Sequence, residues 1–162
     1  MTTRVTRVTK VAGVAGVSVA DPLVRRPPVV PAAHELLATA RHDLAEAMAT
    51  TVATERYAAA HLAALRTAAA VLAVRTRPAA TKRPRNVWSM LPQVAPELTE
   101  WAAFFAAGAG KRAAAEAGLS RAVTPREADD LLRDAQTFLA LVETTLGLDH
   151  QPVIPQLAHR AS

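Results

Sequence analysis

Cysteine is absent from this 162-residue chain, and aromatic residues are scarce. Without thiols there is no disulfide, no thiolate nucleophile and no cysteine-based metal site. The five histidines do not stand at metal-ligand spacing with carboxylates, and no H-E-x-x-H pattern occurs. We therefore expect neither a metal nor another cofactor. A chain without cysteine suits a reducing compartment, so we predict a cytoplasmic location.

Alanine is abundant and indicates a helical protein. Hydrophobic residues make up 51% of the chain, and alanine has the highest intrinsic helix propensity. No alternation typical of strands and no internal repeat emerges. With short connections between the expected helices, this predicts one all-α domain, an antiparallel bundle of four helices, or five if a short one is counted.

Positive charge is concentrated outside the expected bundle. Residues 1–30 hold five cations and one acid, and residues 75–86 hold five cations and no acid. The other segments hold the remaining nine cations and thirteen acids, in a chain of net charge +5. Basic segments of this kind suit nucleic acid or another anionic partner, and they are equally typical of segments that only meet solvent.

The two ends of the chain differ from its middle. Residues 1–31 combine cations, a run of valine, alanine and glycine, and the proline-rich RRPPVVP. This outline is that of a secretory signal, but the run lacks the leucine or phenylalanine of strong signals and is too short to span a membrane. We interpret it as a disordered arm. We expect the bundle at residues 32–147 and a flexible tail at residues 148–162.

The first half of the bundle contains two stretches with apolar residues at helical spacing. The first helix is expected at residues 32–49. The second is expected at residues 52–75, with Thr50 or Thr51 as its N-cap. After a basic connection, the turn VWSMLP at residues 87–92 is expected to return to the core.

The second half contains two more helical stretches. The third helix is expected at residues 96–117, where Gly108 and Gly110 either loosen it or let another helix approach closely. The fourth begins with TPRE, which places Thr124 at the N-cap and Glu127 where a capping box needs it. Its apolar stripe continues to a glycine that ends the helix.

Arg56, Tyr57 and His61 interrupt the alanines of the second helix. Tyr57 and His61 are four residues apart and share the apolar face, whereas Arg56 and His61 are about 140° apart on a regular helix. In one interpretation Arg56 and His61 hold a phosphate, and a second chain closes the site. In the other, His61 is a semi-buried core histidine and Arg56 is a solvated cation.

Several segments, in order, resemble one family. The pattern RYAAAHLAALRTAAAVLA is similar to the tyrosine- and histidine-bearing helix of HEPN domains, the higher-eukaryote and prokaryote nucleotide-binding family. RPRNVWSMLPQVAPELTEWAAFFAAGAGKRAAAEAG and TPREADDLLRDAQTFL resemble the actinobacterial SAV-type branch. The resemblance covers residues 33–147 and implies an all-α HEPN-type bundle, commonly dimeric.

The resemblance also implies a chemistry. Many HEPN domains are metal-independent endoribonucleases with an Arg-x(4–6)-His motif between two protomers, and Arg56 and His61 match this spacing. His61 would be the general acid or base for attack of a ribose 2′-hydroxyl on the adjacent phosphate, and Arg56 would hold that phosphate. Two features depart from the nucleolytic pattern: Tyr57 follows the arginine, and the motif lies on the second helix.

Other polar groups carry weaker signals. Cations near the end of the second helix form a candidate nucleic-acid contact, with Trp88 either as a stacking platform or as part of the core. Those cations are Arg75, Arg77, Lys82, Arg83 and Arg85. The acids Asp129, Asp130 and Asp134 are expected on a solvated face or as a complement to the start of their helix.

Two functions remain open at this level. One is a nucleotide- or RNA-binding HEPN protein, either a metal-independent endoribonuclease or part of a toxin–antitoxin-like or RNA-defence system. The other is a non-catalytic dimeric interaction module. The expected partners are RNA or nucleotide, a second copy and another protein, but no membrane. A ribonuclease needs Arg56 and His61 exposed in one cleft, whereas the module predicts His61 packed against a backbone or hydroxyl partner and Arg56 toward solvent.

Overall fold

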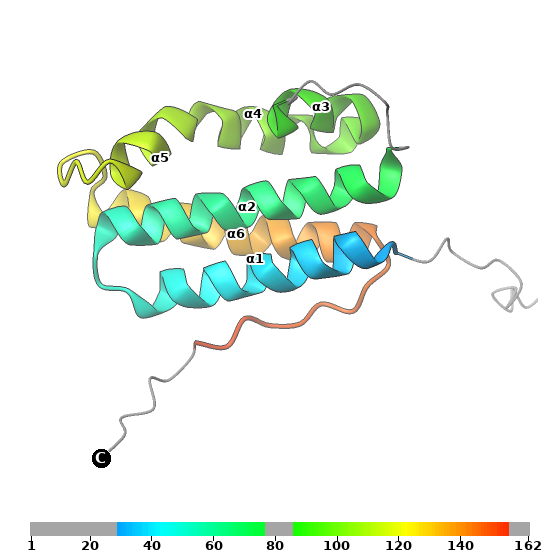
Figure 1. The fold of residues 1–162 in the computed structure, drawn as a ribbon, viewed down its shortest axis with the longest axis horizontal. Helices are drawn as coiled ribbons and strands as arrows, with labels where there is room; N and C mark the ends of the chain where they lie inside the picture. The colour runs from blue at the N-terminus through cyan, green and yellow to red at the C-terminus, as the bar shows by residue number, and fades with distance from the viewer. Residues whose placement is uncertain (1–28, 77–85, 156–162) are drawn as a thin grey trace, which may run out of the picture.

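The computed structural model describes residues 29–76 and 86–155 (Figure 1). These residues form helices and no strand, so the predicted all-α class is confirmed. In chain order the elements are α1 (Pro31–Ala49), α2 (Ala53–Arg75), α3 (Val87–Val94), the 3₁₀ turn η1 (Pro96–Leu98), α4 (Thr99–Ala107), α5 (Ala109–Glu116) and α6 (Pro125–Thr145).

Helix α2 is the centre of the bundle. It packs against α1 and α6 on one side, while α3, α4 and α5 follow one another along its other side (Figure 1). Its buried face is mostly alanine, including Ala60, Ala64 and Ala68, which are fully buried. Side chains this small let the neighbouring helices approach closely, so the alanine-rich composition is used where backbones meet.

The few aromatic side chains gather in one cluster around Phe105. Its ring centroid lies 5.3 Å from those of Trp88 and Phe138, and 5.9 Å from that of Trp101. These residues come from α3, α4 and α6, so the cluster joins the outer row of helices to the rest of the bundle. Aromatic pairs at such distances each add about 0.5–1.5 kcal/mol beyond burial. Trp88 is therefore part of the core, the second of its two predicted roles.

The region predicted as one helix over residues 96–117 is instead divided. A 3₁₀ turn leads into α4, and α4 ends at Gly108, after which α5 begins. A Cβ atom built on Gly108 would lie 2.8 Å from the Tyr57 hydroxyl, whereas one on Gly110 would meet nothing within 4 Å. The close-approach alternative thus holds at Gly108, because α2 packs directly against its Cα.

The predicted threonine N-cap of α2 is wrong. Val52 is the N-cap residue and makes no side-chain capping bond. The connection between the two helices is short, and Thr50 is the C-cap residue of α1. Its N–H donates to the Glu46 carbonyl at 3.0 Å. Its hydroxyl donates to the Glu55 carboxylate at 2.6 Å and accepts from the N–H of Val52 at 3.2 Å.

Helix α6 begins as predicted. The Thr124 hydroxyl accepts from the N–H of Glu127 at 3.2 Å, and the Glu127 carboxylate accepts from the N–H of Thr124 at 2.8 Å. At the other end Gly147 has a positive φ of 72°, and the N–H of Leu148 donates to the Glu143 carbonyl at 2.8 Å. This left-handed glycine reverses the chain, as in a Schellman ending.

The segment at residues 148–155 runs back beside α1 (Figure 1). Leu148 and Val153 are partly buried against the core. The first part of the region predicted as a flexible tail therefore contributes packing to the bundle. The rest of that region and the predicted N-terminal arm before residue 29 lie outside the described residues.

Helix α2 alone among the described residues is long and apolar enough to cross a membrane by length and composition. Its most apolar window is 56% buried inside the bundle. The core position of α2 explains this hydrophobicity, because a central helix must be apolar on several sides. The cytoplasmic location stays a prediction.

Candidate functional site

His61 is enclosed by the bundle. The residue is only 1% exposed, and its Nε2 lies 2.8 Å from the carbonyl oxygen of Phe105. Phe105 is in the last turn of α4, where carbonyl groups lack their usual helical partners. The Tyr57 ring stacks beside the imidazole at 6.5 Å, and the Trp88 ring meets it edge-on at 6.0 Å.

These contacts define the chemical state of His61. A carbonyl oxygen only accepts, so Nε2 carries the proton and donates it. Burial lowers the pKa of the imidazole, although the bond to Phe105 acts in the opposite direction. His61 is therefore neutral near pH 7, and its Nδ1 atom is buried without a hydrogen-bond partner.

Arg56 joins three elements. Its guanidinium donates to two carbonyl oxygens at the end of α1, to Ala47 at 3.1 Å and to Thr50 at 2.6 Å. It also forms an ion pair with Asp129 of α6. The carbonyls at a helix C-terminus need donors and carry partial negative charge, so Arg56 satisfies that end of α1.

The two residues of the Arg-x4-His spacing thus have separate surroundings. His61 turns into the aromatic core, and Arg56 is bound to α1 and α6. Sequence reasoning placed both on α2 but did not identify the backbone partners of either residue. The Phe105 carbonyl and the Asp129 carboxylate come from helices far along the chain, so no local pattern signals them, whereas Ala47 and Thr50 lie shortly before α2.

One member of the candidate basic cluster falls within the described residues. Arg75 pairs with the Glu97 carboxylate at 2.5 Å and donates to the Val94 carbonyl at 3.3 Å. The hydrogen bond that Glu97 receives from its own backbone and the one from Arg75 lower the pKa of that carboxyl. Arg77, Lys82, Arg83 and Arg85 lie outside the described residues.

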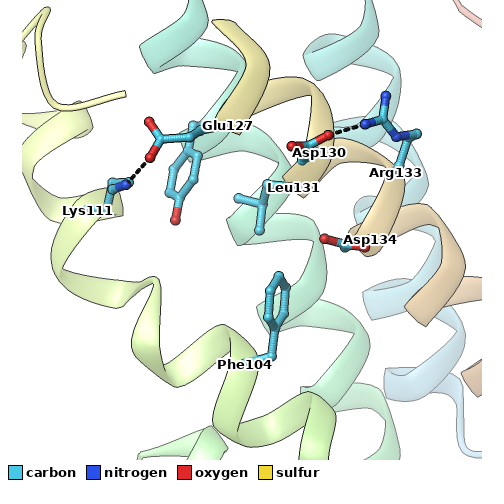
Figure 2. Close-up of a pocket in the computed structure, with 8 residues that line it drawn as sticks. Phe104, Lys111, Glu127, Asp130, Leu131, Arg133 and Asp134 are labelled. Atoms are coloured by element: carbon cyan, nitrogen blue, oxygen red, sulfur yellow. Dashed lines mark hydrogen bonds and ion pairs between the residues drawn. The ribbon is translucent and has the colours of Figure 1, made fainter. Parts of the chain in front are cut away.

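A groove lies between α6 and the row of α4 and α5. Its larger part encloses about 460 Å³ and its smaller part about 350 Å³, and the two share Phe104 and Asp134. Figure 2 shows Phe104 projecting from α4 toward Leu131 and Asp134 of α6. The remaining lining residues are Tyr57, Lys111, Glu127, Asp130 and Arg133 in the larger part, with Glu100 and Trp101 in the smaller.

Two ion pairs form the rim of the larger part (Figure 2). Lys111 contacts the Glu127 carboxylate at 2.5 Å, and Arg133 pairs with Asp130. The hydrogen bond from Lys111, followed by those from Thr124, lowers the pKa of Glu127 to about 2. Two of the three acids predicted on a solvated face therefore form ion pairs, Asp129 with Arg56 and Asp130 with Arg133.

Asp134 differs from its neighbours. Its side chain makes no hydrogen bond or ion pair with any other described residue. Partial burial raises the pKa of its carboxyl, and the negative charge of Asp130 adds to this effect. The groove thus contains an unpaired, partly desolvated carboxylate beside the exposed ring of Phe104.

An ionic cluster that was not predicted from the sequence lies on the opposite side of α6. Glu143 is fully buried, and Arg41 of α1 bonds one of its oxygens through Nε at 2.9 Å and through a terminal nitrogen. His150 donates from Nδ1 to the other oxygen at 2.6 Å. A glutamate four residues after Leu139, on the apolar stripe of α6, is the signal that could have indicated it.

No group of three or more potential metal ligands occurs within the described residues. A second ion pair, between the partly exposed Arg66 and the buried Asp43, joins α1 to α2. Burial raises the pKa of Asp43, while Arg66 acts against this rise. Asp43 of α1 and Glu143 of α6 are therefore each paired with an arginine, and neither offers a free oxygen site to a metal ion.

Comparison with known proteins gives one match. The family model described as SAV_6107-like HEPN matches residues 47–143. The match extends from the end of α1 to the last turn of α6, and it includes the groove and both residues of the Arg-x4-His spacing. No curated protein and no solved structure matches the chain.

Proposed function

This chain belongs to the SAV_6107-like HEPN family, and on that premise we propose that it is a non-catalytic, dimeric interaction module. The supporting observation is the burial of His61, with its Nε2 bonded to the Phe105 carbonyl at 2.8 Å. A general acid or base must reach the proton that it transfers. His61 cannot do so while α4 covers it.

The position of Arg56 supports the same proposal. A phosphate-binding arginine offers an unpaired charge, but the charge of this guanidinium is paired with Asp129, and its other two nitrogens donate to carbonyl oxygens. It is not the solvent-facing arginine expected of the module either. Arg56 instead connects α1, α2 and α6, so its role is structural although it does not point to solvent.

A ribonuclease built on this chain would have to open. The Phe105 carbonyl would have to release His61, and Arg56 would have to leave the end of α1. Both changes expose apolar surface and unsatisfied backbone carbonyls, each of which costs free energy. The groove beside Phe104, by contrast, needs no such rearrangement of the helices to be exposed.

The test is cleavage of a labelled, mixed-sequence RNA in EDTA. The proteins compared are the wild type, His61→Ala, Arg56→Ala and the control Arg126→Ala, which removes a cation whose side chain is 92% exposed. We expect no cleavage by any of them. We also expect His61→Ala to lower the free energy of unfolding by about 1–3 kcal/mol, because it leaves a cavity and removes a buried hydrogen bond.

The proposal fails if the wild type cleaves RNA in the chelator, leaves cyclic-phosphate ends, and loses this activity in both motif variants but not in Arg126→Ala. Anisotropy of the same RNA measures binding without cleavage and so tests RNA as the partner. Sedimentation equilibrium tests the dimer: a monomer throughout the micromolar range would contradict that part of the proposal.

A further inference from the structure

The groove between α4 and α6 has an unused apolar surface. Phe104 is 46% exposed, although the chain has only three phenylalanines and the other two are fully buried. Trp101 continues the apolar lining into the smaller part, and Leu131 forms part of the larger. An aromatic ring left at the edge of a concave site is suited to contact an aliphatic side chain.

The same groove has unbalanced charge. Its lining includes four carboxylates but two cations, and both cations already pair with Glu127 and Asp130. Within the described residues, Asp134 and Glu100 have no cationic partner. A ligand that complements the groove therefore places a guanidinium or ammonium group at Asp134 and an apolar side chain at Phe104.

The chain itself contains such a ligand. Residues 3–11 read TRVTRVTKV, three successive tripeptides of threonine, a cation and valine. Each cation, at Arg4, Arg7 or Lys10, is followed directly by a valine. Residues 1–28 as a whole hold five cations and one acid, opposite in sign to the groove.

The chain length allows the contact. Seventeen residues separate Val11 from Val29, the first described residue, and such a connection spans up to about 55–60 Å when extended. Helix α1 has 19 residues and is only about 28 Å long. The tether therefore reaches any point along the bundle, and it holds the repeat near the groove at an effective concentration of order millimolar.

We propose that the groove between α4 and α6 binds the chain's own Thr3–Val11 segment in cis, with one cation of the repeat at Asp134 and the adjacent valine against Phe104. The three tripeptides offer three equivalent registers. This contact is independent of the proposed function, because it uses neither Arg56 nor His61 and holds whether or not the protein cleaves RNA.

The experiment treats the full-length protein with a water-soluble carbodiimide, which joins amines to carboxylates in direct contact, and maps the products by mass spectrometry. Lys10 is the single lysine of the repeat. We expect it to be joined within one molecule to Asp134 foremost, and less to Glu100 and Asp130. One molar salt should strongly reduce the yield, because it screens exposed charges.

Two variants sharpen the result. Asp134→Asn should reduce the total groove cross-linking of Lys10 about tenfold, the effect of losing one charge-assisted contact. Glu116→Gln is the matched control, since Glu116 is an acid outside the groove that pairs with Arg112. This control should leave the yield unchanged.

A second readout needs no change in the bundle. In the variant Arg4→Ser/Arg7→Ser/Lys10→Ser, acrylamide should quench tryptophan fluorescence more strongly, because Trp101 lines the groove. Lys10 cross-links found equally at Glu35 and Glu116, cross-links only between molecules, or unchanged quenching in the triple variant would each overturn the proposal.

Discussion

Two carboxylates on α6, Glu143 and Asp134, lie in opposite surroundings. Glu143 is fully buried, and both of its oxygens have partners, Arg41 in an ion pair and His150 in a hydrogen bond. Asp134 lies on the groove and has no cationic partner among the described residues. The first acid is closed off by α1 and by the segment after Gly147, while the second faces an open concave surface.

The difference separates a structural acid from an available one. A buried carboxylate is tolerated only when donors and opposite charge replace its lost hydration. Glu143 receives hydrogen bonds and an opposite charge from residues of the chain itself, so it needs no ligand to compensate its burial. Asp134 is partly desolvated without such compensation, as its raised pKa indicates. A missing cation beside an exposed aromatic ring marks where a ligand is most easily accommodated.

The strongest test of this comparison replaces each acid by alanine. Glu143→Ala leaves the Arg41 charge unpaired and should lower the free energy of unfolding by about 3–5 kcal/mol. Asp134→Ala, in the open groove, should lower it by no more than about 1.4 kcal/mol, the equivalent of a tenfold loss of the contact with the Thr3–Val11 segment. Urea unfolding followed by circular dichroism measures both, and equal losses would contradict the distinction.

A smaller effect is expected from the second partner of Glu143. His150→Ala removes one bond to the carboxylate but leaves Arg41 in place, and the His150 side chain is 44% exposed. We expect a loss of about 1 kcal/mol, with the segment at residues 148–155 becoming more open to protease. His42→Ala is a suitable control, because His42 pairs with Glu46 on the surface of α1. Equal protease sensitivity of the two variants would contradict a holding role for His150.

The smallest effect concerns the pH dependence of Asp134. Its pKa is higher in the folded protein than the ordinary value of 3.8, so the folded state binds this proton more readily than the unfolded one. The ionised form therefore disfavours folding above the folded pKa, and this penalty disappears as the pH falls toward 3.8. In the background Arg4→Ser/Arg7→Ser/Lys10→Ser, where no cation of the repeat offsets this charge, Asp134→Asn should be slightly more stable than its parent at pH 7, by less than about 1 kcal/mol. Parallel urea titrations at pH 7 and pH 4 should show the gap narrowing, and a gap that widens would show the sign to be wrong.

Some features of the fold follow from neighbouring residues and were correctly predicted. The TPRE start of α6 encodes its capping box within four residues, and its terminal glycine encodes the reversal. The apolar spacing located α1 and α2 to within a residue or so. Ordered similarity over several segments was enough to identify the HEPN family, which the match confirmed.

Other features depend on distant contacts and were not predictable in detail. The break at Gly108 occurs where Tyr57 of α2 approaches. The N–H of Thr50 bonds to the end of α1, and Val52 is the N-cap residue of α2. The sequence showed that Arg56 and His61 have a particular spacing. It did not show that α4 would enclose one and that α1 and α6 would bind the other.

By itself, the sequence determined the all-α class, the main helices, the start of α6 and the family, because these depend on propensity, periodicity and caps acting over a few residues. Only the tertiary structure decided that His61 is buried, that Glu143 is paired with Arg41 and that Asp134 has no partner in the described groove. The environment of a polar group depends on which helices surround it, and the groups that surround these three side chains include residues far away along the chain: Phe105 at His61, Arg41 at Glu143 and Phe104 at Asp134.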